Sequence, residues 1–251
     1  MIYQVGTCPT SVSAIDTDHD GVLDLIVTNS ESDSISILRG NADGTFQARR
    51  DFTASTWPIS NIAADFNADG HADVALVDWI APTLTVLIGA GNGEFGAPAQ
   101  FAVGDNPRSL VAADFDRDGK LDVVVANGGA RSVSVLRGYG NGSFAPAIDY
   151  PVGIPGWENS EVNSIVVADF DRDGNLDLAV ADFGRDTLVV FRGNSNGIFD
   201  AAQIIAVGIS PSTIAAADFD GDGSIDLAML HYASGHLSVL LNNGIFAASF
   251  E

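Results

Sequence analysis

Residues 114–122 read Asp114-Phe115-Asp116-Arg117-Asp118-Gly119-Lys120-Leu121-Asp122, a nine-residue loop with the pattern D-x-D-x-D-G-x-x-D. The same pattern, with Asn67 at one third position, occurs at 16–24, 65–73, 169–177 and 218–226. The five loops start 49, 49, 55 and 49 residues apart. A fixed period of this size indicates a repeat architecture, in which each period forms one supersecondary unit.

The loop composition predicts a site for a hard cation. Carboxylates at positions 1, 3, 5 and 9 would repel one another without a positive charge among them, and oxygen-only ligation suits Ca²⁺. The glycine at position 6 permits a sharp turn, and position 7 varies as expected of a residue that offers only its backbone carbonyl. We predict about five Ca²⁺ ions, one per repeat, with weakest binding where Asn67 replaces a carboxylate. The predicted ligands are Asp16, Asp18, Asp20, Val22, Asp24, Asp65, Asn67, Asp69, His71, Asp73, Asp114, Asp116, Asp118, Lys120, Asp122, Asp169, Asp171, Asp173, Asn175, Asp177, Asp218, Asp220, Asp222, Ser224 and Asp226.

An EF-hand and a solvated acidic turn are the alternatives to this interpretation. An EF-hand needs a bidentate Glu at position 12 and a helix on each side. Position 12 is apolar in every copy, and the flanking segments are short and rich in β-branched residues, which is typical of strands. An acidic turn without a metal does not explain five copies at matched spacing. The pattern therefore favours a calcium loop at the tip of a β-hairpin.

Each period contains four strand-like segments. In the third period these are 109–115, 121–126, 132–136 and 147–152, and the third of them alternates clearly with a period of two. An Asn-Gly pair at Asn141 and Gly142 favours a tight turn before the fourth segment. Four antiparallel strands in about 50 residues, with no helical periodicity, predict a blade of an all-β propeller. We expect residues 1–251 to form one such domain, with the Phe that follows each Asn-Gly turn buried between blades.

Residues 112–126, from Ala112 to Ala126 around the loop, resemble the FG-GAP or VCBS-type repeat, and the resemblance covers all five periods. Such repeats form the calcium-binding blades of integrin α-subunit propellers and occur in fungal lectins and secreted bacterial proteins. The resemblance implies a propeller with the first strand of each blade innermost and Ca²⁺ in the loop that follows it. Propellers of this family usually have seven blades, whereas this chain has five repeats.

The chain begins and ends in the middle of a repeat. Residues 2–6 look like the end of a fourth strand, and residues 246–251 look like the start of one. We therefore expect five four-stranded blades, closed into a ring by pairing of the N- and C-terminal segments, which would remove an unpaired strand edge. The alternative is part of a larger ring that stays open or is completed by another copy.

The net charge is −22, but nineteen of the 33 acidic residues are loop ligands, so the remaining surface is nearly balanced. No basic stripe is present, which argues against a nucleic-acid partner. No apolar run approaches the length of a membrane span. The lone Cys8 excludes an internal disulfide and is expected to be packed and inert. The chain carries no signal peptide, although the resemblance implies an extracellular, secreted or cell-surface protein, and we expect a monomer.

Strand order places the calcium loops on one face of the propeller and all three tryptophans on the other. Trp57 precedes the first strand of a blade, Trp79 lies between second and third strands, and Trp157 lies in the six-residue insertion of the fourth period. Phe183 and Tyr232 match Trp79 in position. Exposed aromatic residues anchor protein and sugar ligands, so these five residues are the candidate ligand surface. Packing between blades is the alternative role for each of them.

The sequence shows no nucleophile elbow, phosphate-binding glycine loop or acid pair outside the calcium loops. We therefore predict a calcium-stabilised, non-enzymatic binding module whose ligand is a glycan or a protein. Two alternatives stay open: a propeller domain of an enzyme that acts on polysaccharide, and an engineered or trimmed propeller scaffold without a ligand.

Overall fold

The computed structural model describes residues 1–152 and 161–243. The strands of this part form five antiparallel sheets in chain order. The first sheet holds β1 (Pro9–Ile15), β2 (Asp24–Asn29), β3 (Ser34–Leu38) and β4 (Arg50–Thr53), with a short 3₁₀ turn at Ser30–Ser32. The second holds β5 (Pro58–Ala64), β6 (Asp73–Asp78), β7 (Thr83–Leu87) and β8 (Ala99–Ala102).

The later sheets repeat this order. The third sheet holds β9 (Pro107–Ala113), β10 (Asp122–Asn127), β11 (Ser132–Leu136) and β12 (Ile148–Pro151). The fourth holds β13 (Val162–Ala168), β14 (Asp177–Asp182), β15 (Thr187–Phe191) and β16 (Gln203–Ala206). The fifth holds β17 (Pro211–Ala217), β18 (Asp226–His231) and β19 (His236–Leu240). The predicted all-β propeller architecture is confirmed, and the strand bounds expected for the third period differ from the observed ones by at most two residues.

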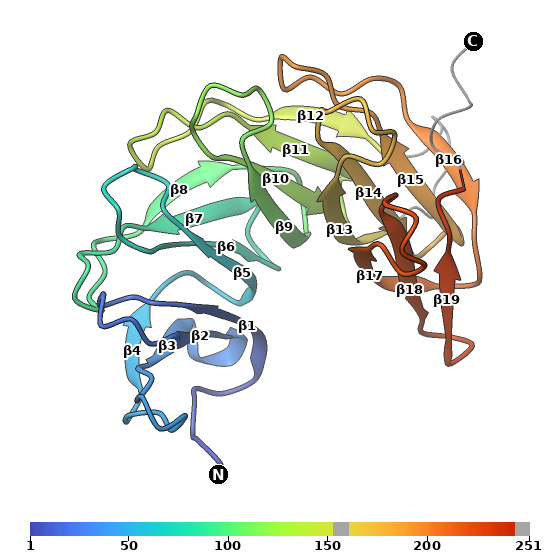
Figure 1. Cartoon of the computed structure of the whole chain (residues 1–251). Coiled ribbons are helices and arrows are strands. Elements are labelled where there is room, and N and C mark those ends of the chain that lie inside the picture. The colour runs from blue at the N-terminus through green and yellow to red at the C-terminus, as the bar shows by residue number, and fades with distance from the viewer. Residues whose placement is uncertain (153–160, 244–251) are drawn as a thin grey trace.

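The sheets stand side by side along an arc, with β1, β5, β9, β13 and β17 innermost (Figure 1). The second strand of each inner sheet is covered on both faces, because a neighbouring sheet packs on either side of it. This explains why β6, β10 and β14 are buried at every residue and read as apolar runs rather than as alternating strands.

Four hydrophobic clusters hold the arc together, one between each pair of successive sheets. Of the phenylalanines that follow these turns, Phe144 and Phe199 lie in the clusters with exposed fractions of 6 % and 5 %, and the partly buried Phe95 packs against another. Each contacts an aromatic residue of the preceding sheet edge-to-face. The expected packing between blades is thus confirmed for Phe95, Phe144 and Phe199. Phe46 is only partly buried and packs on Tyr3 of the N-terminal segment. Phe246 lies outside the described residues.

The two ends of the arc are open. Phe66, Phe115 and Phe170 occupy one repeat position and are 2–3 % exposed, whereas Phe219 at the same position of the fifth sheet is 48 % exposed. Likewise Leu188 is fully buried and its counterpart Leu237 is 63 % exposed. The outer face of the fifth sheet thus presents the side chains that elsewhere bury against a following sheet.

The predicted closure by pairing of the terminal segments is not seen in the described residues. Residues 1–6 form no strand, β19 pairs only with β18, and residues 244–251 lie outside the described part. The four buried clusters each join two successive sheets, and in the described part of the chain the first and fifth sheets stand apart (Figure 1).

The N-terminal segment nevertheless lies where the outer strand of a preceding sheet would lie. Tyr3 contacts Phe46 edge-to-face at 5.5 Å between ring centroids. The same contact joins the outer strand of one sheet to the next sheet at Phe52 and Phe95, where the distance is also 5.5 Å. Residues 1–6 therefore dock on the first sheet as β4 docks on the second.

Replacing Phe170 and Phe219 separately by Ala distinguishes an open arc from a closed ring. In the open arc, Phe170→Ala removes a buried ring and destabilises the protein by about 3–5 kcal/mol, whereas Phe219→Ala costs less than about 1 kcal/mol. Denaturant unfolding of both variants measures the difference. Equal losses would mean that a further sheet covers Phe219 in solution, and the open arc would be wrong.

Candidate metal-binding loops and aromatic face

Each acidic loop is a tight turn wrapped around its first aspartate. In the third sheet, Asp114 accepts hydrogen bonds from the backbone N–H groups of Asp118 at 3.0 Å and Gly119 at 2.9 Å. Gly119 has φ +84°, a left-handed conformation that favours glycine. The bond from Gly at position 6 to Asp at position 1 recurs in all five loops. The glycine predicted to permit the turn therefore does so.

The aspartate at position 9 fastens the loop to the rest of its sheet. Asp122 is 2 % exposed, and its two carboxylate oxygens accept the N–H groups of Phe115 at 3.1 Å and Gly138 at 2.8 Å. A Cβ on Gly138 would lie 2.0 Å from the carbonyl oxygen of Leu121, so a side chain does not fit in this geometry. Both bonds recur in every sheet, at Asp24, Asp73, Asp177 and Asp226.

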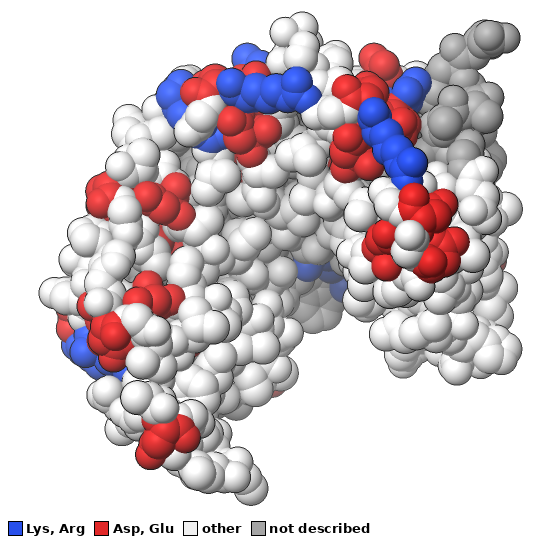
Figure 2. Space-filling model, in the orientation of Figure 1, with Lys and Arg blue, Asp and Glu red and all other residues white. Residues whose placement is uncertain are grey.

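The first, third and ninth positions of the loop come together. In four loops their carboxylates each offer an oxygen within 4.8 Å of the others: Asp16, Asp18 and Asp24; Asp114, Asp116 and Asp122; Asp169, Asp171 and Asp177; Asp218, Asp220 and Asp226. The second loop has the neutral Asn67 at its third position. Position 5 lies outside these groups, and its carboxylate accepts the N–H of position 7 in every loop. Acidic side chains gather in separate clusters along this face of the arc (Figure 2).

The electrostatics of the clusters favour a cation. Burial raises the pKa of Asp177 to about 6, against the lowering effect of its two backbone hydrogen bonds. Burial also raises the pKa values of Asp122 and Asp73, and the charges of nearby loop aspartates raise them further. In the first loop, Oδ1 of Asp18 is buried and has no hydrogen-bond partner among the described residues. Clustered carboxylate oxygens with such a free acceptor fit a hard divalent ion such as Ca²⁺.

Three arginines, which the sequence interpretation missed, neutralise part of this charge. They directly follow the third strand of their sheets, and each pairs with the third-position aspartate of its own loop. Arg39 lies 3.3 Å from Asp18, Arg137 lies 2.8 Å from Asp116, and Arg192 pairs with Asp171. The second sheet has Ile88 at this position, opposite Asn67, and so lacks both members of the pair. The arginine and the aspartate are thus replaced together in the second repeat, and this paired change in the sequence could have revealed the ion pair.

Polar side chains also connect loops of neighbouring sheets. Between the first two sheets, His19 Nε2 lies 2.6 Å from His71 Nδ1. Arg117 in the third loop donates to the carbonyl of Gly174 in the fourth, and Arg172 in the fourth pairs with Asp222 in the fifth at 3.5 Å. The second loop has Ala68 at this position, which has no polar side chain. The boundary between the second and third sheets therefore lacks the link that the other boundaries have.

The predicted aromatic residues lie at the opposite ends of the strands, and they form two pairs. Trp57 and Trp79 are 6.3 Å apart between ring centroids, and Phe183 and Tyr232 are 6.1 Å apart. Trp79 is 41 % exposed and Tyr232 is 79 % exposed, so neither is a buried plug between blades. Trp157 lies outside the described residues.

Two cavities meet at the Trp57–Trp79 pair. One, of about 420 Å³, is lined by Cys8, Thr10, Ser30, Trp57, Ile59, Trp79, Arg108, Asn163 and Ser212, and so draws on all five sheets. The other, of about 620 Å³, is lined by Trp57, Trp79, Ile80, Asp105 and Asn106. Cys8 is exposed at the first cavity, and the expectation of a packed thiol was wrong.

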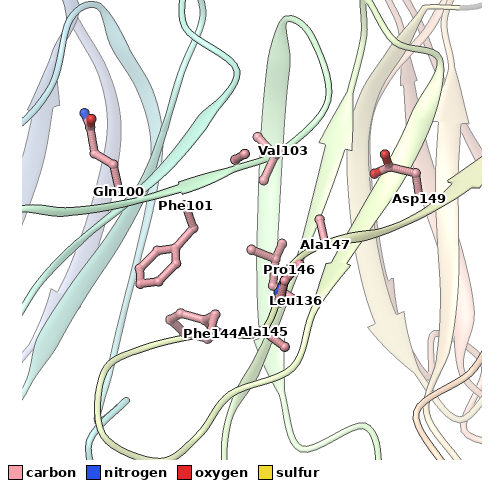
Figure 3. A pocket seen from close by; sticks show the side chains of 10 residues that line it. Gln100, Phe101, Val103, Leu136, Phe144, Ala145, Pro146, Ala147 and Asp149 are labelled. Carbon is pink, nitrogen blue, oxygen red and sulfur yellow. The ribbon is translucent and has the colours of Figure 1, made fainter.

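A third hollow, of about 510 Å³, lies between the outer strands β8 and β12 (Figure 3). Phe101 and Phe144 point into it from two sheets, with Gln100 and Asp149 at its sides (Figure 3). A matching hollow at the first sheet is lined by Tyr3, Leu38 and Gln47. Because the feature recurs where one sheet meets the next, it follows from the packing of the repeat and does not mark a particular ligand.

The five sheets around a central axis, with one acidic loop each, define a β-propeller type of repeat protein. The sequence matches the FG-GAP-like repeat over residues 9–76, 81–125, 115–180 and 169–229. The chain therefore belongs to the FG-GAP-like repeat family, and the resemblance stated from the sequence is confirmed.

Solved structures share the fold. A lectin from Agrocybe aegerita, solved for its recognition of non-reducing terminal N-acetylglucosamine, is 22 % identical, with a TM-score of 0.63 over 94 % of this chain and 64 % of its own. A Lactobacillus plantarum protein is 18 % identical, with a TM-score of 0.65 over 93 % and 70 %. The periplasmic gluconolactonase of Pseudomonas aeruginosa is 20 % identical, with a TM-score of 0.62 over 93 % and 69 %. The chain thus spans about two thirds of the length of these proteins, and 64 % of the lectin.

A comparison with curated proteins found no significant match. Within the described ranges 1–152 and 161–243, no helix is long and apolar enough to cross a membrane.

Changing Arg137 to Ala tests the charge balance of the third loop. Without Arg137, repulsion among Asp114, Asp116 and Asp122 grows, so the metal-free protein loses up to about 1 kcal/mol, or a few degrees in Tm. Added Ca²⁺ should restore this loss, and the difference in Tm with and without Ca²⁺ should exceed that of the unchanged protein.

Arg50→Ala is the matched control, because Arg50 is a similarly exposed arginine that pairs with Glu94 away from the loops. It should leave the Ca²⁺-dependent difference unchanged. An equal widening in both variants would show that Arg137 does not act on the loop.

Proposed function

We propose that this protein is a calcium-binding, calcium-stabilised propeller that acts as a non-enzymatic binding module, with its glycan or protein ligand on the face opposite the acidic loops. One observation carries the calcium part: three carboxylates per loop converge within 4.8 Å in four loops, and their ninth-position members are 0–2 % exposed. Like charges this close together, one of them buried, are costly unless an ion joins them. Oxygen donors alone suit Ca²⁺ better than Zn²⁺.

The role of the ion is to hold the repeats in place. At millimolar Ca²⁺ and a dissociation constant near 10⁻⁴ M, each occupied loop adds on the order of 1 kcal/mol. Several such loops together are comparable to the roughly 5–15 kcal/mol net stability of a typical domain. The position-9 aspartate of each loop links the ends of three strands of its sheet, so the ion would act on the residue that holds the repeat together.

The binding part rests on the aromatic face. Two aromatic pairs remain partly exposed there, and cavities of about 420 and 620 Å³ share the Trp57–Trp79 pair. Concave sites with aromatic walls and a few polar groups are the usual form of ligand sites. The likeness to a glycan-binding lectin concerns the fold and agrees with this reading.

Four other expectations stay predictions: a single domain over 1–251, a monomeric and extracellular protein, the absence of a nucleic-acid partner, and the absence of catalysis. Turnover on a polysaccharide panel at saturating Ca²⁺ tests the last of these, because sustained product formation would favour the enzyme alternative.

Thermal unfolding with EGTA and with added Ca²⁺, together with an ion count per chain, tests the calcium role. We expect chelation to lower Tm markedly and four or five ions to bind. Asp220→Asn should bind one Ca²⁺ fewer or more weakly, because Asp220 has no arginine partner in the fifth sheet, where Leu241 follows the third strand. Its Oδ1 accepts the N–H of Asp222 at 3.1 Å, a bond that an asparagine retains.

Asp43→Asn is the control, since Asp43 accepts bonds from Thr45 in a turn outside the acidic loops. It should leave the ion count and the Ca²⁺-dependent gain in Tm unchanged. A Tm that chelation does not move, or a count of zero, would refute calcium stabilisation.

A further inference from the structure

The cavity of about 420 Å³ lies on the axis of the arc. Five of its lining residues, Thr10, Ile59, Arg108, Asn163 and Ser212, occupy one repeat position, the second residue of each innermost strand. Equivalent positions of five sheets approach one another only around the common axis. The cavity is therefore the mouth of the central channel on the face away from the acidic loops.

Trp57 at this mouth has a backbone conformation that does not suit tryptophan. Its φ is +61°, in the left-handed region, where a bulky residue is unusual and strained. The same turn position has a positive φ in other sheets, where Cys8, Asn106 and Ser210 occupy it. Asparagine is the one of these that favours this conformation. The turn conformation is therefore common to the repeats and does not itself favour tryptophan. The indole side chain of Trp57 must serve another role at the channel mouth.

The polar groups around Trp57 and Trp79 complete a mixed lining. The guanidinium of Arg108 lies over the Trp79 ring at 5.3 Å and is held by Asn106 at 2.7 Å and Glu161 at 2.9 Å. Among the described residues, the buried Oδ1 atom of Asn163 has no hydrogen-bond partner. A buried acceptor without a donor is costly, so a small rotation of this side chain that let the oxygen accept an O–H or N–H from a ligand in the cavity would be favourable.

We propose that this channel mouth binds the terminal residue of a glycan, with a sugar ring on the Trp57–Trp79 pair and a hydroxyl or acetamido N–H donated toward Asn163. The inference rests on the proposed function as a binding module and names the ligand class and its site. Sugars combine apolar ring faces with many donors, which matches indole walls beside a free acceptor. A volume of about 420 Å³ suits one or two sugar residues.

The position of the cavity accounts for recognition of a chain end. A site on the axis, lined by residues of all five sheets, can receive the end of a glycan chain, whereas a polymer that runs across the face would contact only the rim. The sugar residues that follow the terminal one would lie in the adjoining cavity of about 620 Å³. This cavity is also lined by both tryptophans and continues over Ile80, Asp105 and Asn106.

Binding to an immobilised oligosaccharide panel at saturating Ca²⁺ tests the proposal. The panel pairs each chain with one whose non-reducing end is capped by a different sugar. We expect the unchanged protein to bind a subset defined by the terminal sugar, with competition by that free monosaccharide. Trp57→Asn should weaken binding tenfold or more while its Tm stays equal or rises, because Asn106 shows that asparagine suits the turn. Asn163→Leu should weaken binding as well.

Tyr139→Ala is the control, because Tyr139 is an exposed aromatic residue in the turn after β11, on the acidic-loop face and outside this cavity. It should leave binding unchanged. If glycans bind but Trp57→Asn and Asn163→Leu have no effect, the site is wrong and the proposed function stands. If capped and uncapped oligosaccharides bind equally well, the proposed recognition of the glycan's terminal residue is wrong. If no glycan binds, the proposal fails, and a protein ligand captured through Tyr232 would preserve the binding function alone.

Discussion

The structure depends on one carboxylate per repeat, the aspartate at position 9. Each is almost fully buried and accepts one N–H from the start of its own loop and one from the segment after the third strand. Three strands of a sheet are thereby held in register at one end by a single side chain. The same side chain supplies an oxygen to the acidic cluster in four sheets, so the stability of the repeat and the charge of the loop are coupled. Through this coupling, a cation bound as proposed would act on the stability of the fold as well as on the charge of the loop.

Much of this arrangement could be predicted from the sequence, because it depends on local patterns. The recurring loop, the alternating third strand and the Asn-Gly turns each indicate their structure within about ten residues, and the loops, strands and phenylalanine contacts follow. The arginine partners could also have been predicted, because Arg39, Arg137 and Arg192 occupy the same position in their repeats. In the second repeat, Ile88 takes this position and Asn67 takes that of the aspartate.

Features that depend on the arrangement of sheets could not be predicted in the same way. The opening between the first and fifth sheets concerns segments from opposite ends of the chain, and no local motif specifies the distance between them. The axial cavity likewise joins residues that lie one full repeat apart, among them Arg108 and Asn163. The loop positions of the aromatic residues are evident from the sequence, but their arrangement as two pairs depends on how neighbouring sheets pack.

The missing loop link between the second and third sheets makes the arc mechanically uneven. At the loop face, Ala68 and Ile88 leave that boundary with the apolar cluster around Phe66 and Phe144 and a backbone bond from Gly142 to Phe66. The other three boundaries add ionic or imidazole contacts at this face. In a chain of repeats each boundary contributes its own nearest-neighbour term. Cooling weakens apolar association, whereas salt screens exposed charges. The boundary between the second and third sheets would therefore weaken first on cooling. The boundaries between the third and fourth sheets and between the fourth and fifth sheets would weaken first at high salt concentration.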